Sequence, residues 1–280
     1  MRSESNPPGI ARDDRGSRDA SAALARRYTQ DALAYKKLWA PQLRRAAAQL
    51  LGALPLHDAR RVLDVGCGVG ALLDDLAAAA PAATVAGIDL SPGMLRFAPS
   101  RYGRAVMDAT QMGFASGSFD VITMCFMLFH VGDPAAALRD AARVAQPGGW
   151  IGVITWADDP SYPALDAWTE EFESHGAAPL GPVATRHELV DTPDKVANLL
   201  RGAGFTPVRS WTSELNETLD IDAFIEARTQ LGCCRRRFES LDAPTREVCL
   251  RRARARLERM PATDFSDRSS AVFVVASSPG

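Results

Sequence analysis

Val-Leu-Asp-Val-Gly-Cys-Gly-Val-Gly, residues 62–70, is the stretch that decides the fold of this chain. The apolar, β-prone run from Val62 to Val65 ends in three glycines, each separated from the next by one residue, and an alanine-rich helical pattern follows. Glycine allows the backbone to turn sharply after a strand and to approach a ligand where a Cβ would clash. The stretch therefore predicts a strand, a tight turn and a helix, with space for a nucleotide-like ligand across the turn.

The glycine spacing alone does not choose the ligand. Gly66, Gly68 and Ala71 also satisfy the loose G-x-G-x-x-G/A pattern of dinucleotide-binding proteins, which is weak evidence when it stands alone. The discriminating features are Asp64, which lies at the end of the strand, and the segments that follow at regular intervals.

The second segment, residues 84–90, is another buried-strand pattern, and it ends in an acid. Asp89 lies at roughly the distance downstream at which a βαβ unit places a carboxylate for ribose hydroxyls. A carboxylate suits two adjacent hydroxyls because it has two acceptor oxygens. The alternative is that Asp89 caps the next turn. Ser91 and Pro92 then predict the cap and the first position of a helix.

Three later segments complete the pattern. Residues 106–114 place an acid and an alanine before a turn, and Phe119-Asp120 introduces a strand that ends at residues 123–125. Pro-Gly-Gly, residues 147–149, precedes an apolar strand that continues to Trp156. A nicotinamide-dependent dehydrogenase would share the first two segments of the chain but has no reason to share these three.

In this order, the five segments resemble the class I S-adenosylmethionine (SAM)-dependent methyltransferases. Within them the chain is similar to the small-molecule enzymes of ubiquinone and menaquinone biosynthesis. The resemblance implies an α/β fold: a Rossmann-like, doubly wound, seven-stranded sheet with its last strand antiparallel. It also implies an N-terminal helical lid, an inserted helical substrate cap, SAM as the cofactor and S-adenosylhomocysteine (SAH) as the product.

The resemblance also implies roles for single residues. Asp89 would bind the ribose, Leu90 and Met94 would flank the adenine, and Asp108 would accept from the adenine amino group. The alternative for Asp108 is an ordinary loop acid, and Gly113 replaces the proline that is usual in the following turn. The implied cofactor-binding residues are Tyr28, Asp64, Gly66, Cys67, Gly68, Gly70, Asp89, Leu90, Met94, Asp108, Ala109 and Met124.

Composition agrees with an enzyme that acts on a small molecule. The chain has 280 residues, is 46% hydrophobic and 24% charged, and carries a net charge of −2. This balance gives no electrostatic footprint for nucleic acid or an anionic membrane. We found neither an apolar run of membrane-spanning length nor a signal-peptide core, and no metal spacing among the five cysteines. We therefore expect a metal-free cytoplasmic protein, monomeric or homodimeric, with reduced thiols.

The chain divides into a tail, a lid and a core. Residues 1–19 predict a disordered tail, residues 20–55 a helical lid, and residues 56–280 the SAM-binding core. Tyr28 and Tyr35 are candidates for the side of the lid that faces the cofactor, with packing on an amphipathic helix as the alternative.

The core carries two long insertions, at about residues 157–192 and 220–267, which predict a substrate cap beyond the carboxyl ends of the strands. In the first, one predicted helix face could line an apolar pocket or form the seam between cap and core. That face consists of Leu165, Trp168, Phe172 and His175. The second is rich in arginines, which predict a solvated helix face or, alternatively, a site for a substrate phosphate or carboxylate. These arginines are residues 235–237, 251, 252, 254 and 256.

For catalysis, His130 is the candidate general base because it follows the fourth predicted strand and has a suitable intrinsic pKa. The alternative is a structural histidine that orders the loop before Asp133-Pro134, and His175 and Glu171 are second-rank candidates.

We expect SAM-dependent methylation of a small, largely apolar metabolite, with O-methylation of a phenol or carboxylate favoured. One alternative is C-methylation of an aromatic or isoprenoid-like substrate, because aromatic side chains could shelter a developing cation. The candidates for that shelter are Trp156, Trp168, Phe172 and Trp211. An alternative of another class is a protein that binds SAM or SAH without catalysis.

Overall fold

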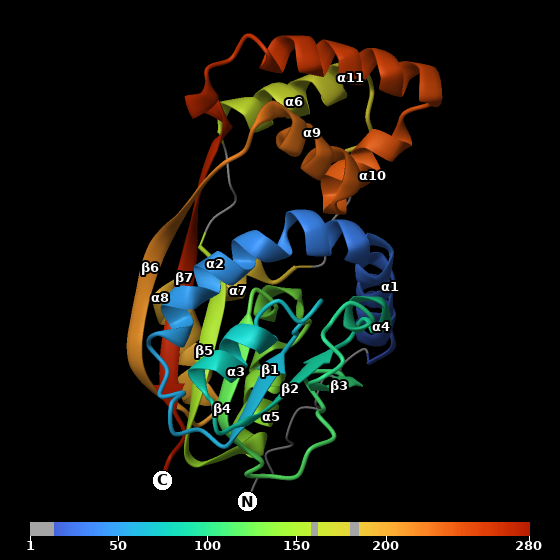
Figure 1. The fold of residues 1–280 in the computed structure, drawn as a ribbon. Helices are drawn as coiled ribbons and strands as arrows, with labels where there is room; N and C mark the ends of the chain where they lie inside the picture. Colours follow the sequence, from blue (N-terminus) through green and yellow to red (C-terminus); the bar gives the residue numbers. More distant parts are fainter. Residues whose placement is uncertain (1–13, 158–161, 180–184) are drawn as a thin grey trace, which may run out of the picture.

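The computed structural model describes residues 14–157, 162–179 and 185–280 of the chain. A mixed sheet with flanking helices forms the body, and a lobe of helices stands on one end of it (Figure 1). The seven strands lie in the order β3-β2-β1-β4-β5-β7-β6. Their bounds are β1 Arg61–Val65, β2 Thr84–Asp89, β3 Gly103–Val106, β4 Phe119–Cys125, β5 Ala145–Trp156, β6 Thr206–Thr218 and β7 Ser266–Ser277.

The direction of the strands confirms the predicted topology. Strands β1 to β5 pair in parallel, whereas β7 is antiparallel to both β5 and β6. The chain runs outward from β1 through β2 to β3, and then returns to the other side of β1 as β4. This reversal creates a crevice at the carboxyl ends of β1 and β4, where open α/β sheets bind their ligands.

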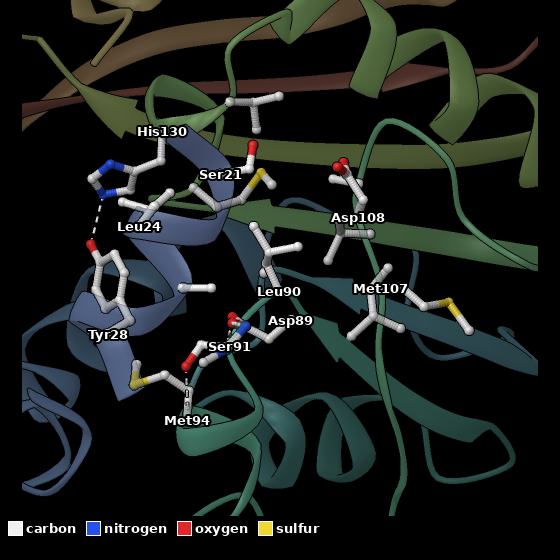
Figure 2. A pocket seen from close by; sticks show the side chains of 18 of the residues that line it. Ser21, Leu24, Tyr28, Asp89, Leu90, Ser91, Met94, Met107, Asp108 and His130 are labelled. Carbon is white, nitrogen blue, oxygen red and sulfur yellow. Dashed lines mark hydrogen bonds between the residues drawn. The ribbon is translucent and has the colours of Figure 1, made fainter. Parts of the chain in front are cut away.

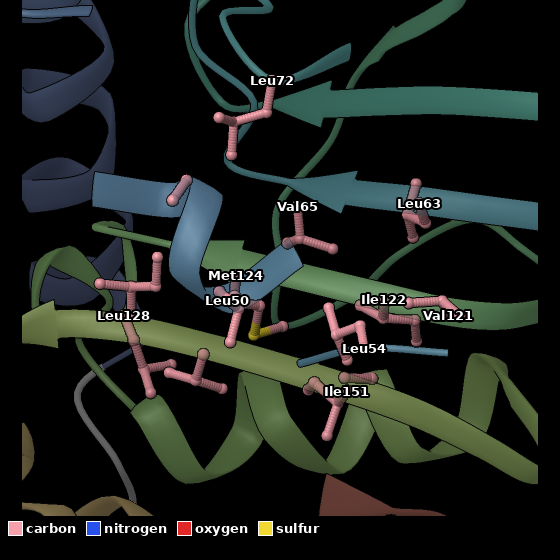
Figure 3. Packing of buried hydrophobic residues seen from close by; sticks show 14 of the residues in the cluster. Leu50, Leu54, Leu63, Val65, Leu72, Val121, Ile122, Met124, Leu128 and Ile151 are labelled. Atoms are coloured by element: carbon pink, nitrogen blue, oxygen red, sulfur yellow. The ribbon is translucent and has the colours of Figure 1, made fainter. Parts of the chain in front are cut away.

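Helices cover both faces of the sheet, so its central strands are buried on both sides. Leu63 and Val65 of β1 and Ile122 of β4 are fully buried, as expected for strands that are covered on both faces (Figure 3). The helices of the body are α2 Ala40–Leu51, α3 Leu73–Ala79, α4 Pro92–Leu95, α5 Pro134–Val144, α7 His187–Val190 and α8 Pro193–Gly202, with the 3₁₀ turn η1 at Leu128–His130.

The N-terminal helix α1, Asp14–Leu38, is longer than the sequence pattern predicted. Residues 14–19 belong to this helix and not to a tail, whereas residues 1–13 lie outside the described part of the chain. Thr29 of α1 contacts Gly93 at the start of α4 so closely that a Cβ on Gly93 would lie 2.5 Å from the Thr29 Cγ2. The helix therefore packs directly against the turn after β2.

The two insertions fold together into the helical lobe, which we call the cap. It consists of α6 Pro163–Ser174, α9 Ile221–Gln230, α10 Gly232–Ser240, α11 Ala243–Leu257 and the turn η2 Ala262–Phe265. Strands β6 and β7 extend from the body to carry it (Figure 1). Among the described residues, no helix is both long and apolar enough to cross a bilayer.

The apolar face of α6 has a different role from either of the two predicted ones. Trp168 stacks on Phe172 with ring centroids 4.4 Å apart, and Phe224 of α9 meets Trp168 edge-on. All three side chains are at least 97% buried, inside a core that belongs to the cap itself. The face is thus neither a substrate pocket nor the seam with the body, because two amphipathic insertions can bury their apolar sides against each other.

The arginines of the second insertion mostly pair with acids of the cap. Arg254 contacts Asp222 at 2.7 Å and Arg256 contacts Glu170 at 2.6 Å, on exposed surface where such pairs add little stability. Arg252 and Arg237 also pair with acids of α6, but in each of these pairs one partner, Glu171 or Arg237, is largely buried. The exposed pairs of Arg254 and Arg256 support the solvated-face alternative. Arg235 differs, because it reaches Asp31 of α1 at 2.6 Å and so joins the cap to the N-terminal helix.

We predict that Gly152→Ala destabilises the body. Helix α2 packs so closely on β5 that a Cβ on Gly152 would lie 2.9 Å from methyl carbons of both Leu50 and Leu54. Overpacking of this kind costs about 1–3 kcal/mol of unfolding free energy, measured by urea denaturation. The matched control is Gly202→Ala in α8, where nothing lies within 4 Å of the added Cβ. Equal stability of the two variants would contradict the packing argument.

Candidate active site

The main cavity opens at the carboxyl ends of the parallel strands, where the sequence placed its ligand groups (Figure 2). Its empty volume, which includes space open to solvent, is about 800 Å³. Helix α1 supplies one wall through Ser21, Leu24, Ala25 and Tyr28. Of the predicted cofactor-binding residues, the cavity is lined by Tyr28, Gly66, Gly68, Asp89, Leu90, Met94, Asp108 and Ala109.

The glycine loop adopts the left-handed backbone that only glycine takes without strain. Gly66, Gly68 and Gly70 have φ values of 72°, 56° and 73°. A Cβ on Gly68 would meet the Met94 methyl group at 3.2 Å, at the wall of the cavity. Gly70 does not line the cavity, because its backbone packs against the Ala98 and Pro99 side chains. The absence of a side chain at Gly70 therefore lets the loop pack closely against the segment after α4.

Asp89 connects two loops of the cavity. One carboxylate oxygen accepts from the Gly68 N–H at 2.9 Å, and the other accepts from the Ser91 N–H at 2.7 Å. Burial raises the pKa of Asp89, and these two donors oppose the rise. Because each carboxylate oxygen has a second lone pair, Asp89 can also accept hydrogen bonds from a ligand. Asp89 therefore caps the turn and also lines the main cavity, where its binding to a ribose stays a prediction.

Asp64 lies deeper, at the end of β1. It is 2% exposed, and its Oδ1 accepts from the Thr123 hydroxyl at 2.7 Å. Burial raises the pKa of Asp64 to about 7, against the hydrogen bond from Thr123, which lowers it. Asp64 and Cys67 line a small cavity on the other side of the glycine loop instead of the main one, and burial also raises the pKa of the Cys67 thiol.

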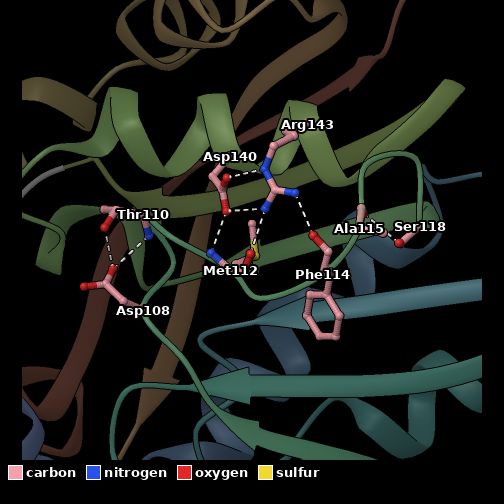
Figure 4. Close-up of polar contacts among 8 residues, drawn as sticks. All are labelled: Asp108, Thr110, Met112, Phe114, Ala115, Ser118, Asp140 and Arg143. Atoms are coloured by element: carbon pink, nitrogen blue, oxygen red, sulfur yellow. Dashed lines mark hydrogen bonds and ion pairs between the residues drawn. The ribbon is translucent and has the colours of Figure 1, made fainter.

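Hydrogen bonds within the loop and from helix α5 fix the loop that carries Asp108. Asp108 accepts from the backbone N–H and the hydroxyl of Thr110 at 2.8 and 2.7 Å (Figure 4). Arg143 of α5 donates to the Met112 and Phe114 carbonyls, and Asp140 accepts from the Met112 N–H. These bonds fix the turn in which Gly113 stands in place of the usual proline.

The side chain of Met124 is fully buried in the core of the sheet and does not line the main cavity. The predicted cofactor contact is made by the backbone carbonyls at the end of β4, so Met124 stays a prediction. Because side chains alternate across a strand, Cys125 faces the cavity instead, followed by Phe126 and Met127. Phe126 was missed, and its φ of 55° is a strained value for a bulky residue.

A second cavity, which we call the aromatic cavity, adjoins the first. Its empty volume is about 720 Å³, and Tyr28, Tyr35, Phe126 and His130 line both cavities. Its remaining walls are Trp39, Leu43, Phe129, Trp156, His187, Asp267 and Ser269. The sequence analysis did not locate this cavity, because its walls come from segments far apart in the chain.

Of the four aromatics considered as a shelter for a developing cation, only Trp156 lines the aromatic cavity. Trp168 and Phe172 lie in the core of the cap, and Trp211 of β6 stacks on Phe273 with ring centroids 5.0 Å apart. The second-rank catalytic candidates, His175 and Glu171, also lie in the cap and line neither cavity.

His130 pairs with Tyr28 at the boundary between the cavities. The Tyr28 hydroxyl lies 2.7 Å from His130 Nε2, and burial raises the pKa of Tyr28 to about 12 (Figure 2). Burial lowers the pKa of His130 to about 3, helped by the nearby charges of Arg27 and His187. Both groups are therefore neutral at physiological pH, and His130 does not keep the ordinary pKa on which its prediction as a general base rested.

Comparison of the sequence with known proteins shows the family to which the chain belongs. Residues 63–153 match the model of a methyltransferase domain. Ubiquinone biosynthesis O-methyltransferase of Bordetella bronchiseptica is 34% identical over 168 residues, which cover 56% of this chain and 67% of that protein. The chain belongs to the class I SAM-dependent methyltransferases.

A second curated relative and one solved structure are also similar to the chain, the latter in fold. Demethylmenaquinone methyltransferase of Beutenbergia cavernae is 37% identical over 147 residues, which cover 50% of this methyltransferase-family chain and 58% of that protein. The matches span 42% to 67% of the lengths of the curated relatives. The [4+2]-cyclase SpnF has the same fold, with a TM-score of 0.53 at 20% identity over 84% of this chain and 81% of its own.

We predict that Asp89→Ala weakens SAH binding by roughly ten-fold or more, because hydrogen bonds to a charged group contribute about 1.5–3 kcal/mol. Isothermal titration measures this loss. Asp74→Ala is the matched control, since Asp74 pairs with Arg101 and Tyr102 on the surface, outside both cavities. Unchanged affinity in a folded Asp89→Ala protein would refute the role of this carboxylate.

We also predict that ligand-free protein loses stability as pH rises from about 4 to 7. The pKa of Asp64 is about 7 in the folded chain and 3.8 as its ordinary value, so the folded state binds the proton more tightly. The stabilisation is complete below pH 3.8 and is lost as pH rises through the folded pKa. We expect a loss on the order of 2–4 kcal/mol relative to Asp64→Asn, which cannot ionise. Urea denaturation measures the unfolding free energy of both proteins across this pH range. The same change with pH in the wild type and in Asp64→Asn would contradict the prediction.

Proposed function

We propose that the chain transfers a methyl group from SAM to an oxygen atom of a small aromatic metabolite. The observation that carries the proposal is the aromatic cavity, which shares the walls Tyr28, Tyr35, Phe126 and His130 with the main cavity. A cofactor in one cavity and a flat substrate in the other would meet at this shared wall. The two relatives described above, whose names refer to ubiquinone biosynthesis and demethylmenaquinone, support substrates of the quinone-biosynthesis kind.

The walls of the main cavity suit SAM. Asp89 offers a carboxylate to two adjacent hydroxyls, and Asp108 offers an acceptor at the rim near Ala109. Leu90 and Met94 supply apolar surface for a flat ring. When bound, SAM supplies a methyl group on a positively charged sulfur, which is open to in-line displacement.

The chain itself chiefly aligns the reactants and keeps out water. Helix α1 lies over the main cavity with Leu24 and Tyr28, and α4 fixes its position through the hydrogen bond between the Thr29 and Ser91 hydroxyls at 2.9 Å. Holding a nucleophile and a methyl group in line replaces a bimolecular encounter with an intramolecular one, which is the main source of rate in such a reaction.

C-methylation of an aromatic ring is the second candidate. Phe126 and Trp156 stand with ring centroids 4.6 Å apart in the aromatic cavity, and their faces can stabilise a cation that develops on a ring. Product analysis separates the two reactions, because only O-methylation yields an ether.

We predict that the protein binds SAM and SAH but not NAD, and that it moves label from methyl-labelled SAM into a small aromatic product. Isothermal titration tests the first part, and incubation with labelled SAM and a metabolite extract tests the second. Binding of SAM without any labelled product would instead support the alternative of a non-catalytic SAM-binding protein. Binding of NAD with no response to SAM or SAH would overturn the proposal.

A further inference from the structure

One nitrogen of His130 has no hydrogen-bond partner among the described residues. Nε2 faces the Tyr28 hydroxyl at 2.7 Å, whereas Nδ1 is buried and makes no hydrogen bond with the described part of the chain. A buried polar atom without a partner is rare, because it loses its water without compensation. Since His130 lines both cavities, a ligand can supply the missing partner.

The surroundings of Tyr28 decide which nitrogen of His130 carries the proton. Among the described residues, the Tyr28 hydroxyl has its hydrogen bond with His130, and the polar neighbour Arg27, whose guanidinium lies 5.3 Å from the Tyr28 ring, has no acceptor. The phenol proton therefore points to Nε2, which accepts it. A neutral imidazole has one proton, so it lies on Nδ1. The reverse arrangement would leave both the phenol proton and Nδ1 without partners.

We propose that His130 is a hydrogen-bond donor and not a general base, and that its Nδ1–H binds an oxygen atom of the substrate in the aromatic cavity. The inference rests on the proposed function, since it assigns the substrate class of the same site. It selects planar aromatic compounds whose oxygen accepts a hydrogen bond, and it favours phenols that bind as phenolates.

The charges around His130 agree with this role. Arg27 and His187 both disfavour a positively charged imidazole, and Tyr28 keeps its proton. His130 therefore accepts a hydrogen bond from Tyr28, but no neighbour favours its protonation as a base. The substrate's own phenol proton is released to solvent when the substrate binds as a phenolate. The phenolate oxygen then forms a bond to the methyl carbon as the carbon–sulfur bond breaks and its electrons return to sulfur. One negative and one positive charge become a neutral ether and a neutral thioether.

Two substitutions distinguish a donor from a base. The amide nitrogen of asparagine in His130→Asn can occupy the place of Nδ1 and keep a donor there. The longer glutamine in His130→Gln reaches the place of Nε2, so it keeps a partner for Tyr28 but removes the donor. Neither amide can act as a base. Tyr28→Phe is a third variant. It removes the hydroxyl that donates to Nε2, so the imidazole proton is no longer fixed on Nδ1.

The probe is 4-nitrophenol, whose phenolate absorbs visible light, titrated into protein saturated with SAH. We expect the pKa of bound 4-nitrophenol to be about one unit lower in the wild type and in His130→Asn than in His130→Gln. The reason is that His130→Gln loses one hydrogen bond to the phenolate. In Tyr28→Phe, the pKa of the bound phenol should lie between these two values. SAH affinity and thermal stability of each variant show that the cavities remain intact.

Equal pKa values of the bound phenol in intact His130→Asn and His130→Gln proteins would overturn the donor assignment, as would failure of 4-nitrophenol to bind the wild type. This titration needs no methyl transfer, so its result is independent of the labelling experiment above. With an identified substrate, we expect turnover of His130→Asn to stay within about ten-fold of the wild type and that of His130→Gln to fall by about a hundred-fold. Equal losses in both variants would point to a base.

Discussion

The carboxylate of Asp89 joins the two turns on which the site depends. By accepting from Gly68 and Ser91 at once, it fixes the glycine loop after β1 relative to the helix start after β2. Ser91 in turn caps α4 and reaches Thr29 of α1. A single half-buried acid therefore connects the two turns at the floor of the main cavity and, through one more hydrogen bond, the helix that covers it. The cost of burying this charge is offset by the N–H donors that surround it.

Much of the body could be predicted from the sequence, because its signals are local. The three glycines and Asp89 determine a turn and a strand end by their own backbone and charge, and the parallel order of the strands follows from their alternation with helices. The sequence also located the end of β4, but it did not say which side chains there face the cavity. A shift of one residue moves a side chain from the ligand face to the core, so Cys125 lines the cavity whereas the side chain of Met124 is buried.

The cap and the aromatic cavity were beyond sequence analysis for a different reason. The amphipathic face of α6 indicated burial, but periodicity does not say against which partner, and the partner is α9 and α11 of a distant insertion. The aromatic cavity likewise combines Trp39, Trp156 and His187 from three segments. The lowered pKa of His130 is a property of that assembly, since it arises from burial beside Arg27 and His187 and not from the histidine itself.

Helix α1 has a kinetic consequence. Tyr28 and Tyr35 of this one helix line both cavities, and α1 is held to the cap through Asp31–Arg235 and to the body through Thr29–Ser91. A displacement of α1 large enough to release the spent cofactor also removes a wall of the aromatic cavity. The two cavities thus share one movable wall, Tyr28 and Tyr35 of α1. For the reaction proposed above, we expect cofactor exchange to follow the departure of the methylated product.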